Sequence, residues 1–200
     1  QLESPKYEKS KQSVSRAYSI SSIPDMKNAV QLIIRRVPDG ICTTWVHDYM
    51  KVGDIVNLTG PFGDFFIRDT DADIIFVAGG SGKAPIKSMV EFAEKYENPR
   101  KMTYFFGART LKDLYLTEDF REHEKKMKDF TYVPVLSAPD PDDQWEGKTG
   151  YIPPYFAEYI REPKNTEAYL CGSPGMISAV EKELVKLGVP KDKVYYDSFG

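Results

Sequence analysis

One stretch of this sequence restricts the fold more than any other, because a buried strand runs through three glycines into an amphipathic helix. Ile74–Ala78 is a continuous apolar run, as in parallel strands covered on both faces. Gly79, Gly80 and Gly82 follow it, and Pro85 suits a first helical turn. Backbone amides and a helix N-terminus can approach a pyrophosphate at such a turn, so the pattern G-x-G-x-x-P predicts a dinucleotide site. The helix face that follows consists of Ile86, Met89, Val90 and Ala93.

Strands and helices alternate after this motif. Helices are predicted at Glu118–Met127 and at Met176–Leu187, the second with Gly188 as its C-cap. The fold class is therefore a doubly wound α/β unit with a parallel sheet of five strands. Ligands of such sheets bind beyond the carboxyl ends of the strands. After Ile74–Ala78, the further strands are predicted at Met102–Ala108, Thr131–Ser137, Ala168–Gly172 and Val194–Asp197.

The first third of the sequence has a different character. Residues rich in β-branched side chains predict strands at Arg16–Ser22 and Val30–Val37, with a third in Asp54–Gly60. A short helix is predicted between the second and third of these strands, capped by Thr43 or Thr44. Gln1–Ser15 is polar and shows no periodic pattern. The charged segment Arg68–Asp73 is the expected boundary between two domains, residues 1–68 and 69–200.

Two side chains follow the second strand of the parallel sheet. Arg109 is placed to contact a ribose or phosphate, and Asp113 to bond a ribose hydroxyl. An arginine after a strand is more often a solvated charge, which is the ordinary explanation of Arg109. No basic cluster marks a 2′-phosphate site, which favours NADH over NADPH.

Cys171-Gly172-Ser173-Pro174 ends the fourth strand. A small side chain beside glycine leaves room for a flat ring, but a buried, inert thiol also explains Cys171. Nucleophilic catalysis requires a base nearby. The two histidines, His47 and His123, are both predicted to be surface residues.

Arg16, Tyr18 and Ser19 lie along one predicted strand. Alternation places Arg16 and Tyr18 on one side, where an anion and a planar ring can share a surface. Ordinary strand packing also explains this sequence.

Composition excludes several classes of protein. Hydrophobic residues at 41% and charged residues at 28% are globular values, and a net charge of -3 argues against a nucleic-acid partner. The two cysteines, Cys42 and Cys171, match neither a disulfide framework nor a metal ligand set. A reducing, cytoplasmic compartment is expected, with membrane contact only through a partner or a preceding segment.

Together these motifs resemble the ferredoxin–NADP reductase superfamily over Arg16 to Gly200. RAYS resembles its R-x-Y-S flavin signature, and GICTT (Gly40–Thr44) resembles its flavin pyrophosphate loop. GGSGKAP resembles the nicotinamide-cofactor loop, and CGSPGM resembles the C-G-x-P-x-M nicotinamide motif. Within the superfamily, GPFGDFF, WEGKTGYI and the last fourteen residues are similar to the FAD/NADH modules of sodium-translocating NADH:quinone reductases. Reductase components of phenol hydroxylase-type monooxygenases are a second likeness.

On the flavin side, the resemblance implies that Arg16 pairs with the pyrophosphate of FAD and that Tyr18 packs on its isoalloxazine. Ser19 would bond near flavin N5, and Phe199 would cover the other face of the ring. The residues implied along the pyrophosphate and ribityl chain are Gly40, Cys42 and Thr43.

On the nicotinamide side, Arg109 would hold the ribose and phosphate of NADH, and Cys171 would lie beside the reactive carbon. Ser19 and Cys171 are therefore the implied catalytic residues. The other residues implied in NADH binding are Gly80, Ser81, Gly82, Pro85, Gly172 and Pro174.

The resemblance has two departures. Family members have further barrel strands before R-x-Y-S, so residues 1–68 are expected to form only the C-terminal part of an FAD-binding β barrel. Lys83 stands where relatives usually carry an apolar residue.

The implied activity is hydride transfer from NADH to FAD, then single-electron transfer to an iron–sulfur domain or protein, with a membrane reductase complex as a candidate setting. A monooxygenase reductase component, a non-catalytic nucleotide-binding electron-transfer protein, and a chain that binds NADH without flavin are the alternatives.

Overall fold

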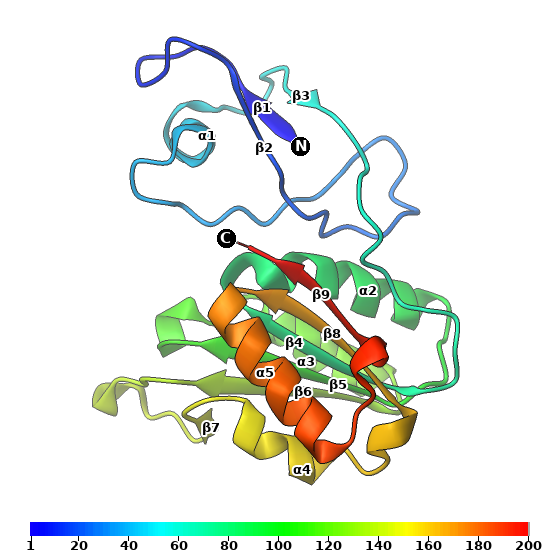
Figure 1. Cartoon of the computed structure of the whole chain (residues 1–200). Coiled ribbons are helices and arrows are strands. Elements are labelled where there is room, and N and C mark those ends of the chain that lie inside the picture. Colours follow the sequence, from blue (N-terminus) through cyan, green and yellow to red (C-terminus); the bar gives the residue numbers. More distant parts are fainter. Residues whose placement is uncertain (200) are drawn as a thin grey trace.

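The computed structural model describes residues 1–199, and a parallel sheet dominates it (Figure 1). Its order is β7-β6-β5-β4-β8-β9, and every neighbouring pair is parallel. The predicted fold class is confirmed, but the predicted strand number is wrong: the sheet has six strands, because Lys148–Thr149 adds a two-residue edge strand that is too short for a hydrophobic pattern. The strands are β4 (Asp73–Gly79), β5 (Met102–Ala108), β6 (Phe130–Leu136), β7 (Lys148–Thr149), β8 (Thr166–Gly172) and β9 (Val194–Ser198).

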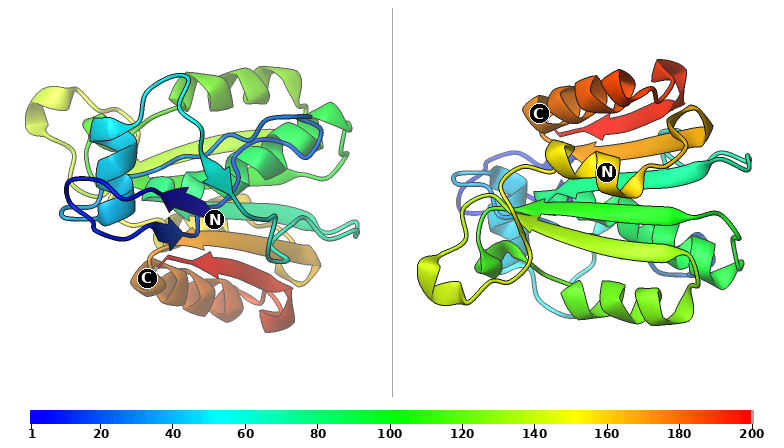
Figure 2. Two further views of the ribbon diagram at one scale, coloured as in Figure 1. Left: turned by 90° about the horizontal axis from the view of Figure 1, so that it is seen from above. Right: turned by 90° about the horizontal axis from the view of Figure 1, so that it is seen from below.

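Helices cover both faces of this sheet (Figure 2). On one face α2 (Lys83–Lys95) and α3 (Thr117–Lys126) pack against a core that includes Phe76. On the other face α4 (Phe156–Tyr159) and α5 (Pro174–Leu187) pack against a core that includes Phe105. Alternate residues of each strand point to opposite faces, so β4 contributes to both cores.

The ends of α5 follow the sequence closely. Ser173 is the N-cap, and its Oγ accepts a hydrogen bond from the Met176 amide. Gly188 ends the helix with φ of 106°, a left-handed conformation that glycine adopts without a Cβ clash. Among the described residues, no helix is long and apolar enough to cross a membrane. Single 3₁₀ turns lie at Gly80–Gly82, Leu111–Asp113, Pro141–Asp143, Pro153–Tyr155, Pro163–Asn165 and Lys191–Lys193.

The amino-terminal part, residues 1–67, is built around a small antiparallel sheet of order β2-β1-β3 (Figure 1). One helical segment packs on it, where α1 (Ile41–Thr44) continues into a π-helical turn over Trp45–Tyr49. This helix was predicted, but the predicted cap is wrong, because Gly40 is the N-cap and Thr43 and Thr44 lie inside the helix. β1 was missed because its residues lie in a polar segment. The three strands are β1 (Leu2–Ser4), β2 (Val14–Arg16) and β3 (Asn57–Leu58).

The long strands predicted at Arg16–Ser22 and Val30–Val37 are wrong. Beyond Arg16 the two segments share a single antiparallel bridge, between Ile20 and Leu32. The backbone instead meets side chains of α2, because Ser88 Oγ donates to the Ser22 carbonyl at 2.8 Å. The partner of this segment is therefore a helix surface, which periodicity cannot reveal.

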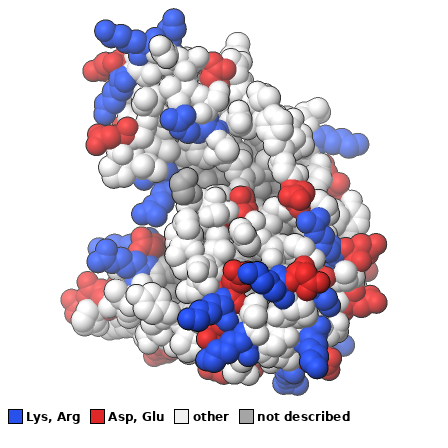
Figure 3. Space-filling view, in the orientation of Figure 1, with Lys and Arg blue, Asp and Glu red and all other residues white. Residues whose placement is uncertain are grey.

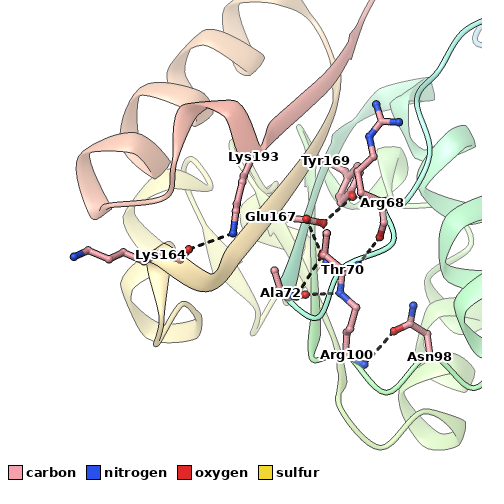
Figure 4. A network of polar contacts seen from close by, with 9 residues as sticks. All are labelled: Arg68, Thr70, Ala72, Asn98, Arg100, Lys164, Glu167, Tyr169 and Lys193. Atoms are coloured by element: carbon pink, nitrogen blue, oxygen red, sulfur yellow. Dashed lines mark hydrogen bonds and ion pairs between the residues drawn. The ribbon is translucent and has the colours of Figure 1, made fainter.

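A buried polar network attaches residues 68–72, the segment that connects the two parts, to the sheet (Figure 4). Arg100 forms an ion pair with Glu167 at 2.7 Å, with both side chains almost fully buried. Arg100 also donates to the carbonyls of Arg68 and Ala72. Thr70 donates to the other oxygen of Glu167 at 2.8 Å. The segment 68–72 is thus held at the end of the sheet opposite the carboxyl ends of its strands.

Candidate functional site

A cleft of about 1050 Å³ lies at the carboxyl ends of β4, β5, β6 and β8. The chain leaves β4 for β5 on one side, while β8 pairs with β4 on the other, so the cleft lies where the strand order reverses. This is the position at which doubly wound sheets bind ligands. Ile33, Ile34 and Arg35 of the amino-terminal part form its other wall. Figure 3 shows the hollow between the two parts, with basic side chains near its opening.

The glycine loop after β4 contains partly exposed and buried positions. Gly80 and Ser81 line the cleft, and Gly80 has φ of 55°, which favours glycine. Gly82 is buried, and a Cβ there would lie 2.1 Å from the Cys171 carbonyl oxygen. Pro85 is buried in the first turn of α2. Of the predicted residues, Gly80 and Ser81 therefore face the cleft. Gly82 allows the start of α2 to approach β8, and Pro85 is buried within the helix.

Beyond β5, Arg109 and Asp113 were predicted from the sequence as cofactor-binding residues, whereas Lys112 was not. Arg109, Lys112 and Asp113 all line the cleft. Asp113 Oδ2 accepts hydrogen bonds from the amide and hydroxyl of Thr110, at 2.9 and 3.0 Å, which fixes the loop. Arg109 and Lys112 line the same end of the cleft as the Asp113 carboxylate. This end of the cleft therefore suits a ligand in which an anionic group lies next to a hydroxyl.

At the end of β8, Gly172 and Ser173 line the cleft, whereas Cys171 has an exposed fraction of 0%. Burial raises the pKa of the Cys171 thiol, and the charge of Asp197 raises it further. The thiol is therefore protonated at neutral pH. Pro174 is the first residue of α5 and is exposed outside the cleft wall.

Ser19 is joined to the last strand of the sheet, which sequence reasoning missed. Its Oγ donates to Asp197 Oδ2 at 2.9 Å. Asp197 is the register partner of Cys171, and the Phe199 amide donates to the Gly172 carbonyl at 2.9 Å. Phe199 lines the cleft. The only signal for Asp197 in the sequence is a carboxylate within the final aromatic segment, YYDSFG.

The remaining predicted flavin residues form a separate group in the amino-terminal part. Arg16 is exposed, and Tyr18 is half-buried against the core of Leu2, Cys42 and Trp45. Burial and a hydrogen bond with Cys42 raise the pKa of the Tyr18 hydroxyl.

Gly40 and Thr43 shape the turn before α1. The Thr43 hydroxyl hydrogen-bonds backbone groups of Val37 and Gly40, and Cys42 is buried. A Cβ at Gly40 would lie 2.6 Å from Thr43 Oγ1, so a side chain at this position would displace the Thr43 hydroxyl. Gly40, Cys42 and Thr43 do not line the cleft.

These residues fit the two cofactors that the fold implies. The glycine loop presents its backbone to an open cleft at a helix N-terminus, as a pyrophosphate requires. The exposed guanidinium of Arg16 and the half-buried ring of Tyr18 suit the anionic and planar parts of a flavin nucleotide.

Family models match both parts of the chain. An oxidoreductase FAD-binding domain matches residues 5–67, and an oxidoreductase NAD-binding domain matches residues 76–182.

Curated relatives include the F component of the Na(+)-translocating NADH-quinone reductase of Serratia proteamaculans, 39% identical over 199 residues. The corresponding protein of a Marinomonas species is 36% identical over 203 residues. The matches cover 92% and 94% of this chain and 49% and 50% of those proteins, so the chain spans about half the length of these relatives.

Solved structures agree with this fold. Amycolatopsis cytochrome P450 reductase GcoB superposes with a TM-score of 0.82 at 29% identity, over 91% of this chain and 55% of that one. The ferredoxin reductase in carbazole 1,9a-dioxygenase gives 0.81 at 28% identity, over 94% and 56%. With an NAD-binding domain model covering more than half of its residues, the chain belongs to the ferredoxin reductase family of FAD- and NAD-binding oxidoreductases.

Proposed function

We propose that the chain transfers hydride from NADH to FAD and passes single electrons to an iron–sulfur domain or protein. The observation that carries this proposal is a contact between the two parts beside the cleft, two residues before Phe199, which lines it. Ser19 lies next to the proposed flavin residues, and its hydroxyl donates a hydrogen bond to Asp197. Asp197 on β9 is the register partner of Cys171 on β8. Residues 1–68 would be the C-terminal part of the FAD-binding domain, and residues 69–200 the NADH-binding domain.

Each residue has a defined task in this proposal. The amides of Gly80 and Ser81 bind the pyrophosphate of NADH, and Arg109 binds its ribose–phosphate side. Gly172 keeps the end of β8 open for a flat ring. When bound, FAD supplies the hydride-accepting and one-electron chemistry, while the protein supplies orientation and electrostatics.

Ser19 and Cys171 serve as polar groups at the meeting point of the two rings. Asp197 accepts a hydrogen bond from the Ser19 hydroxyl, so the lone pairs of the Ser19 oxygen remain available to accept another hydrogen bond. The protonated thiol of Cys171 provides a neutral, compact neighbour for the nicotinamide. The remaining assignments proposed from the motifs are Arg16, Tyr18, Gly40, Cys42 and Thr43 for FAD, and Gly82, Pro85, Pro174 and Phe199 around the nicotinamide.

The curated relatives are named as components of an NADH-quinone reductase, which supports such a complex as the first choice. We propose that the chain lies on the cytoplasmic side of the membrane in this complex. A monooxygenase reductase component is the second, because the structural matches include a cytochrome P450 reductase and a dioxygenase ferredoxin reductase. The two candidates can be distinguished by offering the NADH-reduced protein the ferredoxin domain of an NADH:quinone reductase and that of a monooxygenase system. The domain that becomes reduced identifies the system.

The absorbance spectrum of the purified protein tests the proposal directly. We expect a visible flavin band that NADH bleaches anaerobically. Tyr18→Ala should lose most of the flavin, whereas Tyr96→Ala, an exposed tyrosine at the end of α2, should retain it. A colourless protein that cannot be reconstituted with FAD, or a Tyr18→Ala variant with normal colour and turnover, contradicts the assignment.

Cys171→Ala addresses the nicotinamide side. Flavin content should stay normal while stopped-flow flavin reduction slows by about tenfold, equivalent to ~1.4 kcal/mol of barrier. An unchanged reduction rate removes Cys171 from the site.

A further inference from the structure

Lys83 is a buried cation directly behind the glycine loop. It is the first residue of α2, and its exposed fraction is 0%. A fully buried lysine is rare in proteins unless its ammonium group is paired. The first turn of α2 contains no acidic residue. The roles proposed above do not explain this side chain.

Aromatic rings and two oxygen atoms surround the Lys83 ammonium. Nζ donates to the Tyr115 carbonyl at 2.5 Å and to the Tyr132 hydroxyl at 3.3 Å. Rings with a negative face attract a desolvated cation, so this cage favours the protonated amine. The distances from Nζ to the ring centroids are 3.7 Å for Phe106, 4.7 Å for Tyr115, 4.9 Å for Phe120 and 5.4 Å for Tyr132.

Tyr115 connects this cage to the cleft. Its side chain lines the cleft, and its hydroxyl donates to the Gly80 carbonyl at 2.7 Å. Lys83 therefore holds the backbone of Tyr115, and Tyr115 holds the carbonyl of the loop residue that faces the ligand. A change of charge on Nζ alters the first of these bonds and so the support of the loop.

The electrostatic surroundings of Lys83 are balanced near neutral pH. Burial lowers the pKa of Lys83 to about 7, and the charge of Asp119 on α3 opposes this shift. The positive end of the α2 dipole also disfavours a cation in its first turn, whereas a bound pyrophosphate would favour it. The other titratable groups facing the cage are Tyr104 on β5, Tyr115, Tyr132 on β6 and Cys171 on β8, with Arg121 and Glu124 on α3 beside Tyr132.

We propose that Lys83 is a positioning residue of the NADH site, and that the site takes up a proton from solvent at Lys83 Nζ when a pyrophosphate binds at the N-terminus of α2. The protonated amine then donates more strongly to Tyr115 and fixes Gly80 against the ligand. This inference rests on the proposed function, since it requires NADH to occupy the cleft.

Binding of ADP-ribose tests the inference without reducing the flavin, because this probe carries the pyrophosphate of NADH but no hydride. Calorimetry of the unmodified protein in two buffers of different ionisation enthalpy measures protons directly. We expect uptake of about half a proton near pH 7.5 if binding raises the pKa of Lys83 from about 7 by about one unit. The Kd should then rise about tenfold between pH 6 and pH 9.

Lys83→Met keeps the shape of the side chain and removes its charge. Its Kd for ADP-ribose should lose the pH dependence, lying about tenfold above wild type at pH 6 and close to wild type at pH 9. Lys95→Met, an exposed change at the other end of α2, should keep the wild-type profile. A purely structural role predicts equal weakening at every pH.

Absence of proton uptake in the unmodified protein overturns the inference, even if Lys83→Met fails to fold. An unchanged pH profile in Lys83→Met also overturns it. If NADH bleaches the flavin but ADP-ribose binds without proton uptake, only this inference fails. If neither nucleotide binds, the proposed function fails with it.

Discussion

The two parts of the molecule share one chain but differ in how they bury apolar surface. The sheet unit, residues 73–199, has a core on each face, with 15 buried residues on one and 14 on the other. The core of the amino-terminal part contains three, namely Leu2, Cys42 and Trp45. Since burial of apolar area is the main favourable term in folding, the sheet unit has by far the larger source of stability.

Exposed apolar residues show the same contrast. Ile55 is 95% exposed and Phe62 is 71% exposed, within a segment where Val52, Leu58 and Phe66 are also exposed. Strands β1, β2 and β3 contain only two or three residues each. The amino-terminal part is therefore held mainly by its contacts with α2, β9 and the buried network at residues 68–72. We expect its local stability to be lower than that of the sheet unit.

The largest effect should come from Phe105→Ala. Phe105 is fully buried, and its ring packs edge-on against Phe156 and Tyr159 at centroid distances of 5.3 and 5.2 Å. The cavity should lower the free energy of unfolding of the sheet unit by about 3–5 kcal/mol, measured by urea denaturation.

Trp45→Ala is the matched change in the amino-terminal part, since Trp45 is also a buried aromatic residue. Hydrogen exchange should show protection lost within residues 1–67 while the sheet unit keeps its protection. If Trp45→Ala destabilises the sheet unit as much as Phe105→Ala does, the two parts unfold as one unit and the contrast is wrong.

Glu167→Gln should have the next largest effect, because it leaves the buried Arg100 guanidinium without its charged partner. We expect a loss of about 3 kcal/mol and looser attachment of residues 68–72. The surface pair of Glu183 and Lys186 is the control, since Glu183→Gln should cost less than about 0.5 kcal/mol. Equal effects of the two changes in thermal unfolding would show that the buried pair contributes no more than a surface pair.

The Glu167 carboxylate also makes the free energy of unfolding depend on pH. Burial alone raises the pKa of Glu167, but hydrogen bonds from Arg100, Thr70 and the Tyr169 hydroxyl outweigh this and hold the pKa below the usual 4.5. The unfolded chain thus binds the proton first as the pH falls. The stabilisation that ionised Glu167 contributes to the folded state is present above pH 4.5. It is lost as the pH drops through the lower pKa of Glu167 in the folded state. Glu167→Gln should lack this part of the acid dependence in a pH series of unfolding curves.

The smallest effect should come from Ile55→Ser. A side chain that is almost fully exposed loses little on substitution, so the free energy of unfolding should change by less than about 0.5 kcal/mol. A loss above ~1 kcal/mol in urea denaturation would show that Ile55 is covered in solution, and that the amino-terminal part is better packed than its structure indicates.

The sequence predicted the sheet unit well because its signals are local. The apolar run Ile74–Ala78, the glycines after it and the caps of α5 act over a few residues, and each appears in the structure where expected. The edge strand β7 was missed because two residues carry no periodicity. In the amino-terminal part, the strands predicted at Arg16–Ser22 and Val30–Val37 are wrong, since β propensity does not reveal that the partner of this segment is the side of α2.

The doubly wound sheet, the glycine loop and the end of the sheet that carries the cleft could therefore be predicted from the order of residues alone. Packing in three dimensions was needed to establish that Ser19 bonds Asp197, 178 residues away, that Arg35 forms part of the cleft wall and that Lys83 is enclosed by four rings. The physical reason is range. Periodicity and capping are set by neighbours within a turn or two, whereas these contacts depend on how distant segments pack, which no local pattern specifies.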